Sequence, residues 1–374
     1  MAGALDGIRV ADLSRVLAGP YATMLLADLG AQVFKVERPP LGDDTRQWGP
    51  PFDADGVSTY YDSVNRNKRA LVLDLASEAG RRDARALIRS CDVVVENFVP
   101  GTMEKFGLGY AELAAEQPAL IYASISGFGR SPEAAAMPGY DLLVQAVGGL
   151  MSITGPDAQS PTKVGVALVD VVTGLHCAFG IMAALRHREA TGEGQRVEVS
   201  LLGSLLSGLV NQAGAYVGAG VVPRAMGNAH PSIAPYETFA TADRALALAV
   251  GNDAQFRACV KALGMPALAD DERFRSNPLR VANRQALHGL LQEALSRQGA
   301  EHWATLFTDV GVPSGPVNGI DEAFALAERL GLTPIVAAGG IPTVAHPVQF
   351  SRTPAQYRLR PPGIGSTDID QVLS

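Results

Sequence analysis

The stretch that most constrains the fold runs from Lys163 to Leu202. Its first residues, KVGVALV, are an apolar run of the strand type that stops at Asp170. The residues that follow have apolar positions at helical spacing, with Gly192 as a cap. GQRVEVSLL then returns to a strand pattern. We therefore place Asp170 between a buried strand and a helix, where open α/β sheets bind ligands. An aspartate there is equally typical of a helix N-cap, a role that does not exclude a catalytic one.

The N-terminal third alternates strand and helix patterns. Strand patterns occur at 8–13, 31–39, 69–75, 91–98 and 119–129, and helix patterns at 20–30 and 78–90. A strand, a helix and a second strand within about 30 residues form a βαβ unit, whose strands are parallel. The sequence therefore predicts an α/β fold with a doubly wound, Rossmann-like sheet.

The pattern changes after residue 205. A long apolar helix or helix pair rich in small residues comes first, and a strand at 245–252 and helices at 254–264, 283–296 and 302–311 follow. We predict a large domain at 1–205 that residues 320–374 complete, linker helices at 206–224, and a small α+β domain at 225–315.

Composition narrows the function. A formal net charge of −7 gives no basic surface for nucleic acid, and no polybasic membrane anchor is present. Three scattered cysteines form neither a disulfide framework nor a metal-ligand pattern. The first residues lack the basic start and apolar run of a signal peptide, and no uninterrupted apolar stretch reaches about 18 residues. We expect a soluble cytoplasmic protein that binds neither nucleic acid nor membrane.

Common catalytic motifs are missing. The sequence has no GxxxxGK[ST], HExxH, GxSxG or CxxC, and the first strand-to-helix turn lacks GxGxxG. Glu37 stands where a ribose-binding acid would be, but without the glycines it is a weak dinucleotide signal. The helix that Pro20 opens could accept an anion such as a CoA phosphate.

Several longer segments carry a resemblance. RVLAGPYATMLLADLGAQVFKVERP, NRNKRALVLDL, VVVENFVPGTMEKFGLGY, PGYDLLVQAVGGLMSITG and TGEGQ resemble class III CoA-transferases. That group contains formyl-CoA transferase, carnitine CoA-transferase and the methylacyl-CoA racemases. The resemblance implies transfer of CoA from an acyl-CoA to a free carboxylic acid, with no metal. It also implies a CoA-binding Rossmann-like domain built from both chain ends, a small domain, and a homodimer of interlinked subunits.

The resemblance gives Asp170 the role of nucleophile. Its carboxylate would attack the donor thioester, and an aspartyl-CoA thioester would form by way of a mixed anhydride. A helix N-terminus beside Asp170 would favour its ionised form. Backbone N–H groups nearby would stabilise the tetrahedral oxyanion.

Other positions match the family's CoA site and active site. The CoA positions are Val16, Ala18, Arg38, Lys68, Arg69, Asn97 and Phe98. Tyr140, in PGYD, occupies an active-site position where racemases carry histidine. Because racemisation needs an acid/base group at that position, Tyr140 favours a transferase.

Two differences within the family restrict the substrate. Leu17 stands where the formyl-CoA branch has glutamine, which disfavours oxalate. GNAHPSIAPY, around His230, replaces that branch's glycine run, and with RVLAGP it is closer to transferases that use succinyl-CoA and dicarboxylic acids. Arg15 or Arg46 could bind a distal carboxylate through two hydrogen bonds. The alternatives are a 2-methylacyl-CoA racemase or isomerase, and a non-catalytic acyl-CoA-binding protein that would not need the Asp170 nucleophile.

Overall fold

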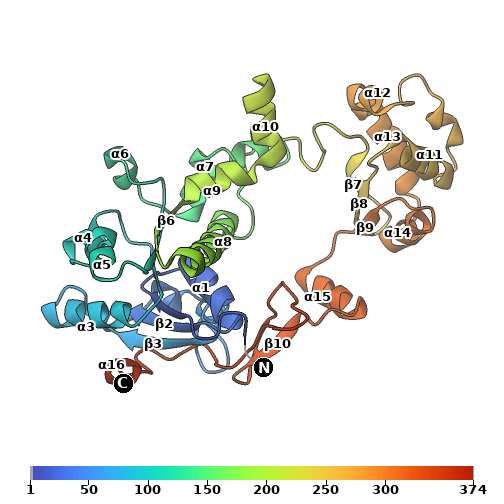
Figure 1. The fold of residues 1–374 in the computed structure, drawn as a ribbon. Coiled ribbons are helices and arrows are strands. Elements are labelled where there is room, and N and C mark those ends of the chain that lie inside the picture. The colour runs from blue at the N-terminus through green and yellow to red at the C-terminus, as the bar shows by residue number, and fades with distance from the viewer. Residues whose placement is uncertain (1–2, 374) are drawn as a thin grey trace. The chain divides into compact units, whose positions relative to one another are not determined.

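The computed structural model describes residues 3–373, which group into two compact units (Figure 1). The first unit contains the residues up to 150, 164–221 and those from 333 onward. The second contains 151–163 and 222–332. The predicted boundaries of the folding domains stay predictions.

A six-stranded parallel sheet forms the centre of the first unit, in the order β3-β2-β1-β4-β5-β6. Its strands are β1 (Arg9–Asp12), β2 (Gln32–Glu37), β3 (Lys68–Val72), β4 (Val93–Glu96), β5 (Ile121–Ser126) and β6 (Arg196–Ser200). This is the predicted doubly wound order, and its direction of winding reverses between β1 and β4. The predicted α/β class is confirmed.

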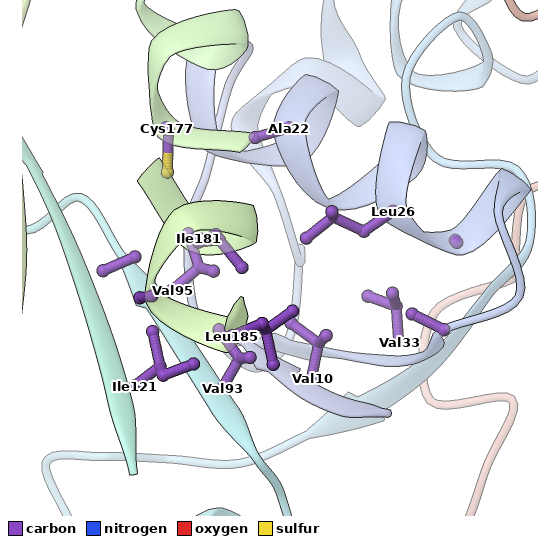
Figure 2. Close-up of a cluster of buried hydrophobic side chains, with 14 of the residues drawn as sticks. Val10, Ala22, Leu26, Val33, Val93, Val95, Ile121, Cys177, Ile181 and Leu185 are labelled. Carbon is purple, nitrogen blue, oxygen red and sulfur yellow. The ribbon is translucent and has the colours of Figure 1, made fainter. Parts of the chain in front are cut away.

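Each face of this sheet is covered by helices. On one face, α1 (Ala18–Asp28) and α8 (Leu168–Thr191) pack on alternate residues of the strands, as Figure 2 shows for Val10, Val93 and Val95. On the other face, α3 (Glu78–Arg89) packs on the residues between them, such as Ala11 and Val94. Because both faces are buried, the strands are apolar along most of their length.

Shorter helices and turns complete the first unit. They are η1 (Asp44–Gln47), α2 (Thr59–Asp62), α4 (Thr102–Lys105), α5 (Tyr110–Glu116), α6 (Pro132–Ala135), α7 (Asp141–Val147), α9 (Leu201–Gly208), α10 (Val210–Ala219) and α16 (Ile369–Leu373). The C-terminal segment adds a hairpin of β10 (Ile335–Ala338) and β11 (Ile341–Val344).

Buried polar side chains join the C-terminal segment to the sheet. Asn67 accepts the backbone N–H groups of Arg358 and Leu359 and donates to the Gln356 carbonyl. Beside it, Arg66 forms a buried ion pair with Asp28, with an N–O distance of 2.6 Å. The first unit therefore depends on residues almost 300 positions apart in the chain.

The predicted strand at 163–169 is wrong. Residues 163–167 form no strand, and helix α8 already begins at Leu168. The N–H of Val164 donates to the side chain of Gln145, and β5 is the strand that pairs with β6. An apolar run of this length fits either a strand or the start of a helix. The rest of the stretch is confirmed: α8 ends at Gly192, whose φ is 80°, and β6 follows.

Helix α8 is also long and apolar enough to cross a membrane, the single described helix that is. Its buried side chains, among them Cys177, Ile181 and Leu185, belong to the core on the sheet (Figure 2). A central core helix meets the same criteria of length and composition as a membrane span. One face of α8 packs on the sheet, and 39% of its most apolar window is buried.

The second unit is built on a small antiparallel sheet in the order β7-β8-β9. Its strands are β7 (Tyr236–Ala240), β8 (Ala245–Ala249) and β9 (Ser314–Pro316). Its helices and turns are η2 (Met151–Ile153), α11 (Asp253–Ala262), η3 (Pro266–Ala269), α12 (Asn277–Ala282), α13 (Arg284–Leu295), α14 (Ala300–Asp309) and α15 (Ile320–Arg329). The predicted strand at 245–252 and the three predicted helices are confirmed.

Candidate active site

A cavity of about 210 Å³ lies at the carboxyl ends of four neighbouring strands of the large sheet. The loops after β1, β4 and β5 line it, together with Leu201, which directly follows β6. This is the position where open parallel sheets bind their ligands, next to the reversal between β1 and β4. The predicted site residues that line it are Arg15, Val16, Ala18, Asn97, Phe98, Tyr140 and Asp170.

The loops after β1 and β4 are joined by a pair of hydrogen bonds. The Asn97 side chain accepts the Arg15 N–H at 2.9 Å and donates to the Arg15 carbonyl at 2.8 Å. The Arg15 guanidinium also lies over the Phe98 ring, 5.7 Å from its centroid. The two loops therefore form one wall of the cavity.

Asp170 lies in the first turn of α8, and it is not the N-cap. Ala167 occupies the cap position without a side-chain hydrogen bond. The capping group comes from α7: Asp141 Oδ1 accepts the N–H groups of Val169 and Asp170 at 2.8 and 3.3 Å. Asp170 therefore belongs to the first turn of the helix and lines the cavity, and its own carboxylate does not cap the helix.

The remaining N–H groups of this turn are also occupied. Leu168 donates to the Val166 carbonyl, and Val171 donates to the Ala167 carbonyl. The first-turn N–H groups of α8 are therefore not available to an oxyanion, contrary to the expectation from the helix N-terminus. An oxyanion would have to be stabilised by other groups in the cavity.

The expected preference of Asp170 for its ionised form is also reversed. Burial raises the pKa of the Asp170 carboxyl, and the nearby Asp141 carboxylate raises it further, to about 7. Desolvation and a neighbouring like charge both disfavour a second negative charge. Near neutral pH, the protonated and ionised forms of Asp170 are therefore both populated.

Tyr140 lines the same cavity from the residue that precedes α7. Its position depends on the close approach of two glycines: a Cβ on Gly127, after β5, would lie 2.5 Å from the Cα of Gly139. Only residues without a side chain fit there. The contact holds the PGYD segment against the end of the sheet, with the Tyr140 side chain 62% exposed.

Two residues near Asp170 were missed by the sequence reasoning. One is Asp141, which directly follows Tyr140 in PGYD. The available signal was a carboxylate next to a predicted active-site residue. Tyr60, in α2, is the other. Burial together with the Asp170 and Asp141 charges raises the pKa of the Tyr60 phenol to about 12. Nothing in its sequence context distinguishes Tyr60, because the segment before β3 has no periodic pattern.

Arg38 lies in a second cavity of about 190 Å³, which shares Arg15 and Phe98 with the first. Leu13, Val36, Leu73 and Leu75 make much of its wall apolar. Arg38 forms an ion pair with Asp44, a residue that also lines the first cavity. Glu37, at the position of a ribose-binding acid, is bound by Arg46. The Nε and Nη2 of Arg46 donate to the Glu37 carboxylate at 2.8 and 2.6 Å.

The other predicted residues lie apart from the first cavity. Lys68 is fully buried, and its Nζ donates to Asp12, Asn65 and the Pro20 carbonyl, which leaves no N–H for a phosphate. Arg69, on β3, lines separate hollows beside the C-terminal segment.

Arg46 and His230 are also engaged elsewhere. Arg46 binds Glu37, the Tyr61 hydroxyl and the Pro362 carbonyl. His230, in the second unit, accepts the Ser232 N–H, and its ring lies 5.3 Å from the Tyr236 ring. Over residues 3–373, no group of three or more His, Cys, Asp or Glu side chains could hold a metal ion.

Known proteins are similar to this chain in sequence and in fold. The pattern described as CoA-transferase family III matches residues 5–368. A succinate–glutarate CoA-transferase of Agrobacterium fabrum is 45% identical over 99% of this chain and 95% of its own. An acetyl-CoA:oxalate CoA-transferase of Acetobacter aceti is 41% identical over 93% of this chain and 90% of its own. The crystal structure of a CAIB/BAIF family protein from Brucella suis superimposes with a TM-score of 0.88, at 41% identity, over 98% of this chain and 97% of its own.

Proposed function

Because the chain belongs to CoA-transferase family III and is a CoA-transferase, we propose that it moves CoA through a covalent intermediate on Asp170. One observation carries the proposal: the Asp170 carboxyl lines a cavity at the carboxyl ends of the strands, together with Tyr140 and the CoA-site loops. The other carboxylate among the lining residues, Asp44, is ion-paired with Arg15 and Arg38.

The proposed reaction has four steps, in which each attack releases one leaving group. The ionised Asp170 oxygen attacks the donor thioester carbonyl, the C–S bond breaks, and a mixed anhydride and the CoA thiolate form. The thiolate attacks the aspartyl carbonyl, which releases the donor acid and leaves an aspartyl-CoA thioester. The acceptor carboxylate attacks that thioester, the C–S bond breaks, and a second anhydride and the CoA thiolate form. The thiolate then attacks its acyl carbon, which gives the new acyl-CoA and frees Asp170.

The two adjoining cavities suit the two ends of an acyl-CoA. The first holds the acyl group and the thioester at Asp170. The second, with apolar walls and Arg38 at its edge, takes the far end of the CoA molecule. Lys68 and Arg69 have no part in this arrangement, since Lys68 has no free donor and Arg69 faces other hollows.

The acceptor in this proposal is a dicarboxylic acid, with succinyl-CoA as donor. The relative from Agrobacterium fabrum is named for the two dicarboxylic acids succinate and glutarate. Arg15 supplies a matching group: its Nη1 is bound to Asp44 at 3.3 Å, but its Nε is buried with no hydrogen-bond partner among the described residues. A distal carboxylate of the acid would provide that partner. Arg46 is excluded from this role by its bonds to Glu37.

The nucleophile is tested with Asp170→Asn. The amide keeps the shape but removes the attacking oxygen anion, so turnover is expected to fall by on the order of 10³-fold or more. Incubation of the wild type with succinyl-CoA alone should give an adduct on the Asp170 peptide by mass spectrometry, and hydroxylamine should release it. Full activity in Asp170→Asn, or an adduct on another residue, contradicts the mechanism.

The acceptor is tested by comparing glutarate with pentanoate, which has the same length and one carboxylate fewer. In the wild type, kcat/KM should favour glutarate, and Arg15→Gln should reduce that preference by about tenfold. Arg69→Gln is the matched control and should leave the preference unchanged. A wild-type preference for pentanoate would refute the dicarboxylate assignment.

Tyr140 separates transferase from racemase. With Tyr140 in place of histidine, the wild type should not exchange the α-proton of a 2-methylacyl-CoA with solvent deuterium. Exchange as fast as any transfer of CoA would favour the racemase.

A further inference from the structure

The loop after β1 is held almost entirely by side chains. The N–H of Ser14 donates to Asp12, and its carbonyl accepts from Lys35 Nζ at 3.2 Å. Both backbone groups of Arg15 bond to Asn97. The Val16 N–H donates to the Asp43 carboxylate at 3.3 Å. Buried backbone groups need hydrogen-bond partners. Here side chains supply the partners that a neighbouring strand supplies within a sheet.

Lys35 and Asp43 form the centre of this arrangement. Their ion pair is 2.8 Å long, and the two side chains are 0% and 1% exposed. Asp43 also caps the η1 turn, because its side chain accepts the N–H and the hydroxyl of Thr45. One carboxylate therefore joins the loop after β1 to the loop after β2. The first loop lines both cavities, and Asp44 of the second lines the cavity that holds Asp170.

The pair is costly for the fold. Lys35 lies within a buried strand, between Phe34 and Val36, where an apolar residue would pack without desolvating a charge. A buried ion pair is often no more stabilising than apolar residues of the same size. Val16 adds a second cost, because a β-branched residue at φ 68° is strained. Violations of local preference concentrate at functional sites.

We propose that Lys35 and Asp43 are positioning residues, which hold the loop of residues 14–16 in the conformation that binds acyl-CoA. Neither touches the reacting atoms; they act through the Ser14 carbonyl and the Val16 N–H. The inference rests on the proposed acyl-CoA site.

The test compares two buried ion pairs of the same unit. Lys35→Met/Asp43→Asn removes both charges of the first pair together and keeps an oxygen for Thr45. Arg66→Met/Asp28→Asn does the same to a pair 2.6 Å long that lies outside both cavities. For each protein, the dissociation constant of CoA and the hydrogen exchange of the peptide containing residues 14–16 are measured.

Only the first double variant should bind CoA more weakly, by about tenfold or more, and exchange faster in that peptide. The control should lose thermal stability while keeping the wild-type affinity. If affinity and exchange are unchanged, or if both change equally in the control, the positioning role is wrong. Should the double variant fail to fold, Lys35→Met alone provides the same test with the same direction expected, because Asp43 keeps the hydrogen bonds from Val16 and Thr45.

The outcome also separates the two proposals. A wild type that binds no CoA refutes the proposed function. Hydrogen exchange still decides whether the ion pair holds the loop, because that measurement needs no ligand.

Discussion

The Asp141 carboxylate caps the helix that carries Asp170, with its Oδ1 3.3 Å from the Asp170 nitrogen. One contact therefore has two effects. It satisfies the first turn of α8, and it places a second negative charge beside the proposed nucleophile. Gln145 keeps the cap in place, since its Nε2 donates to Asp141 Oδ2 at 2.5 Å.

The pH dependence of the reaction should report this relationship. Only the ionised Asp170 attacks, so kcat/KM of the wild type should rise with pH along a limb with a pKa of about 7. Asp141→Asn removes the neighbouring charge while its oxygen still caps α8, so the limb should move to lower pH. Burial is the larger cause and remains, so the pKa should stay above the ordinary 3.8. Identical pH profiles for the two proteins would contradict the assigned cause.

Asp170 should also make the protein less stable as pH rises. Its folded pKa, about 7, is above the 3.8 expected when unfolded, so between these values the unfolded chain binds fewer protons. The free energy of unfolding therefore falls as pH rises from 3.8 to 7. Asp170→Asn lacks this cost, and its Tm relative to the wild type should increase between pH 4 and pH 8. A constant difference in Tm over this range would contradict the raised pKa.

Helix α8 can approach α1 closely because residue 174 is a glycine. Gly174 lies one helical turn after Asp170, and a Cβ at this position would lie 2.6 Å from the Ala18 carbonyl oxygen. Gly174→Ala should push the first turns of α8 away, at a cost of about 1–3 kcal/mol. It should also lower kcat, because Asp170 moves with the helix. Gly289→Ala in α13, where a Cβ meets nothing within 4 Å, should gain up to about 1 kcal/mol and leave kcat unchanged.

The exposed apolar residues of α8 and α10 support the predicted homodimer. Phe179, Val210 and Val217 are 75%, 72% and 83% exposed. Exposed apolar residues that lie together mark protein interfaces, and a partner subunit would cover these side chains. If the subunits are interlinked, as the family resemblance implies, they cannot separate without unfolding. Sedimentation at nanomolar concentration should therefore show a dimer, and a monomer would contradict the prediction.

Much of the fold follows from the sequence because its signals are local. The alternation of strands and helices, the helix stop at Gly192 and the long helix itself could all be predicted from periodicity and caps. The start of α8 could not, because its first residues are as apolar as a strand. The state of Asp170 was missed for a different reason: its capping group and neighbouring charge come from Asp141, 29 residues earlier.

The site residues show the same division between features that local sequence signals predict and contacts that only the fold creates. Loop positions such as Val16 and Asn97 were found from the family motif, and the structure brings them together with Asp170. Lys68 and Arg46 are basic residues near the same loops, yet both are bound to internal carboxylates. Sequence alone does not distinguish a free cation from one that the fold has already paired.

The bonds of Asn67 have a consequence for synthesis of the chain. Every strand of the large sheet has left the ribosome once residue 200 has emerged. Asn67 must then wait for residues 356–359, more than 150 residues later, before its side chain finds its partners. The nascent first unit therefore lacks these hydrogen bonds while residues 222–332 of the second unit are made. Release of the finished chain, and not completion of the sheet, is the event that supplies them.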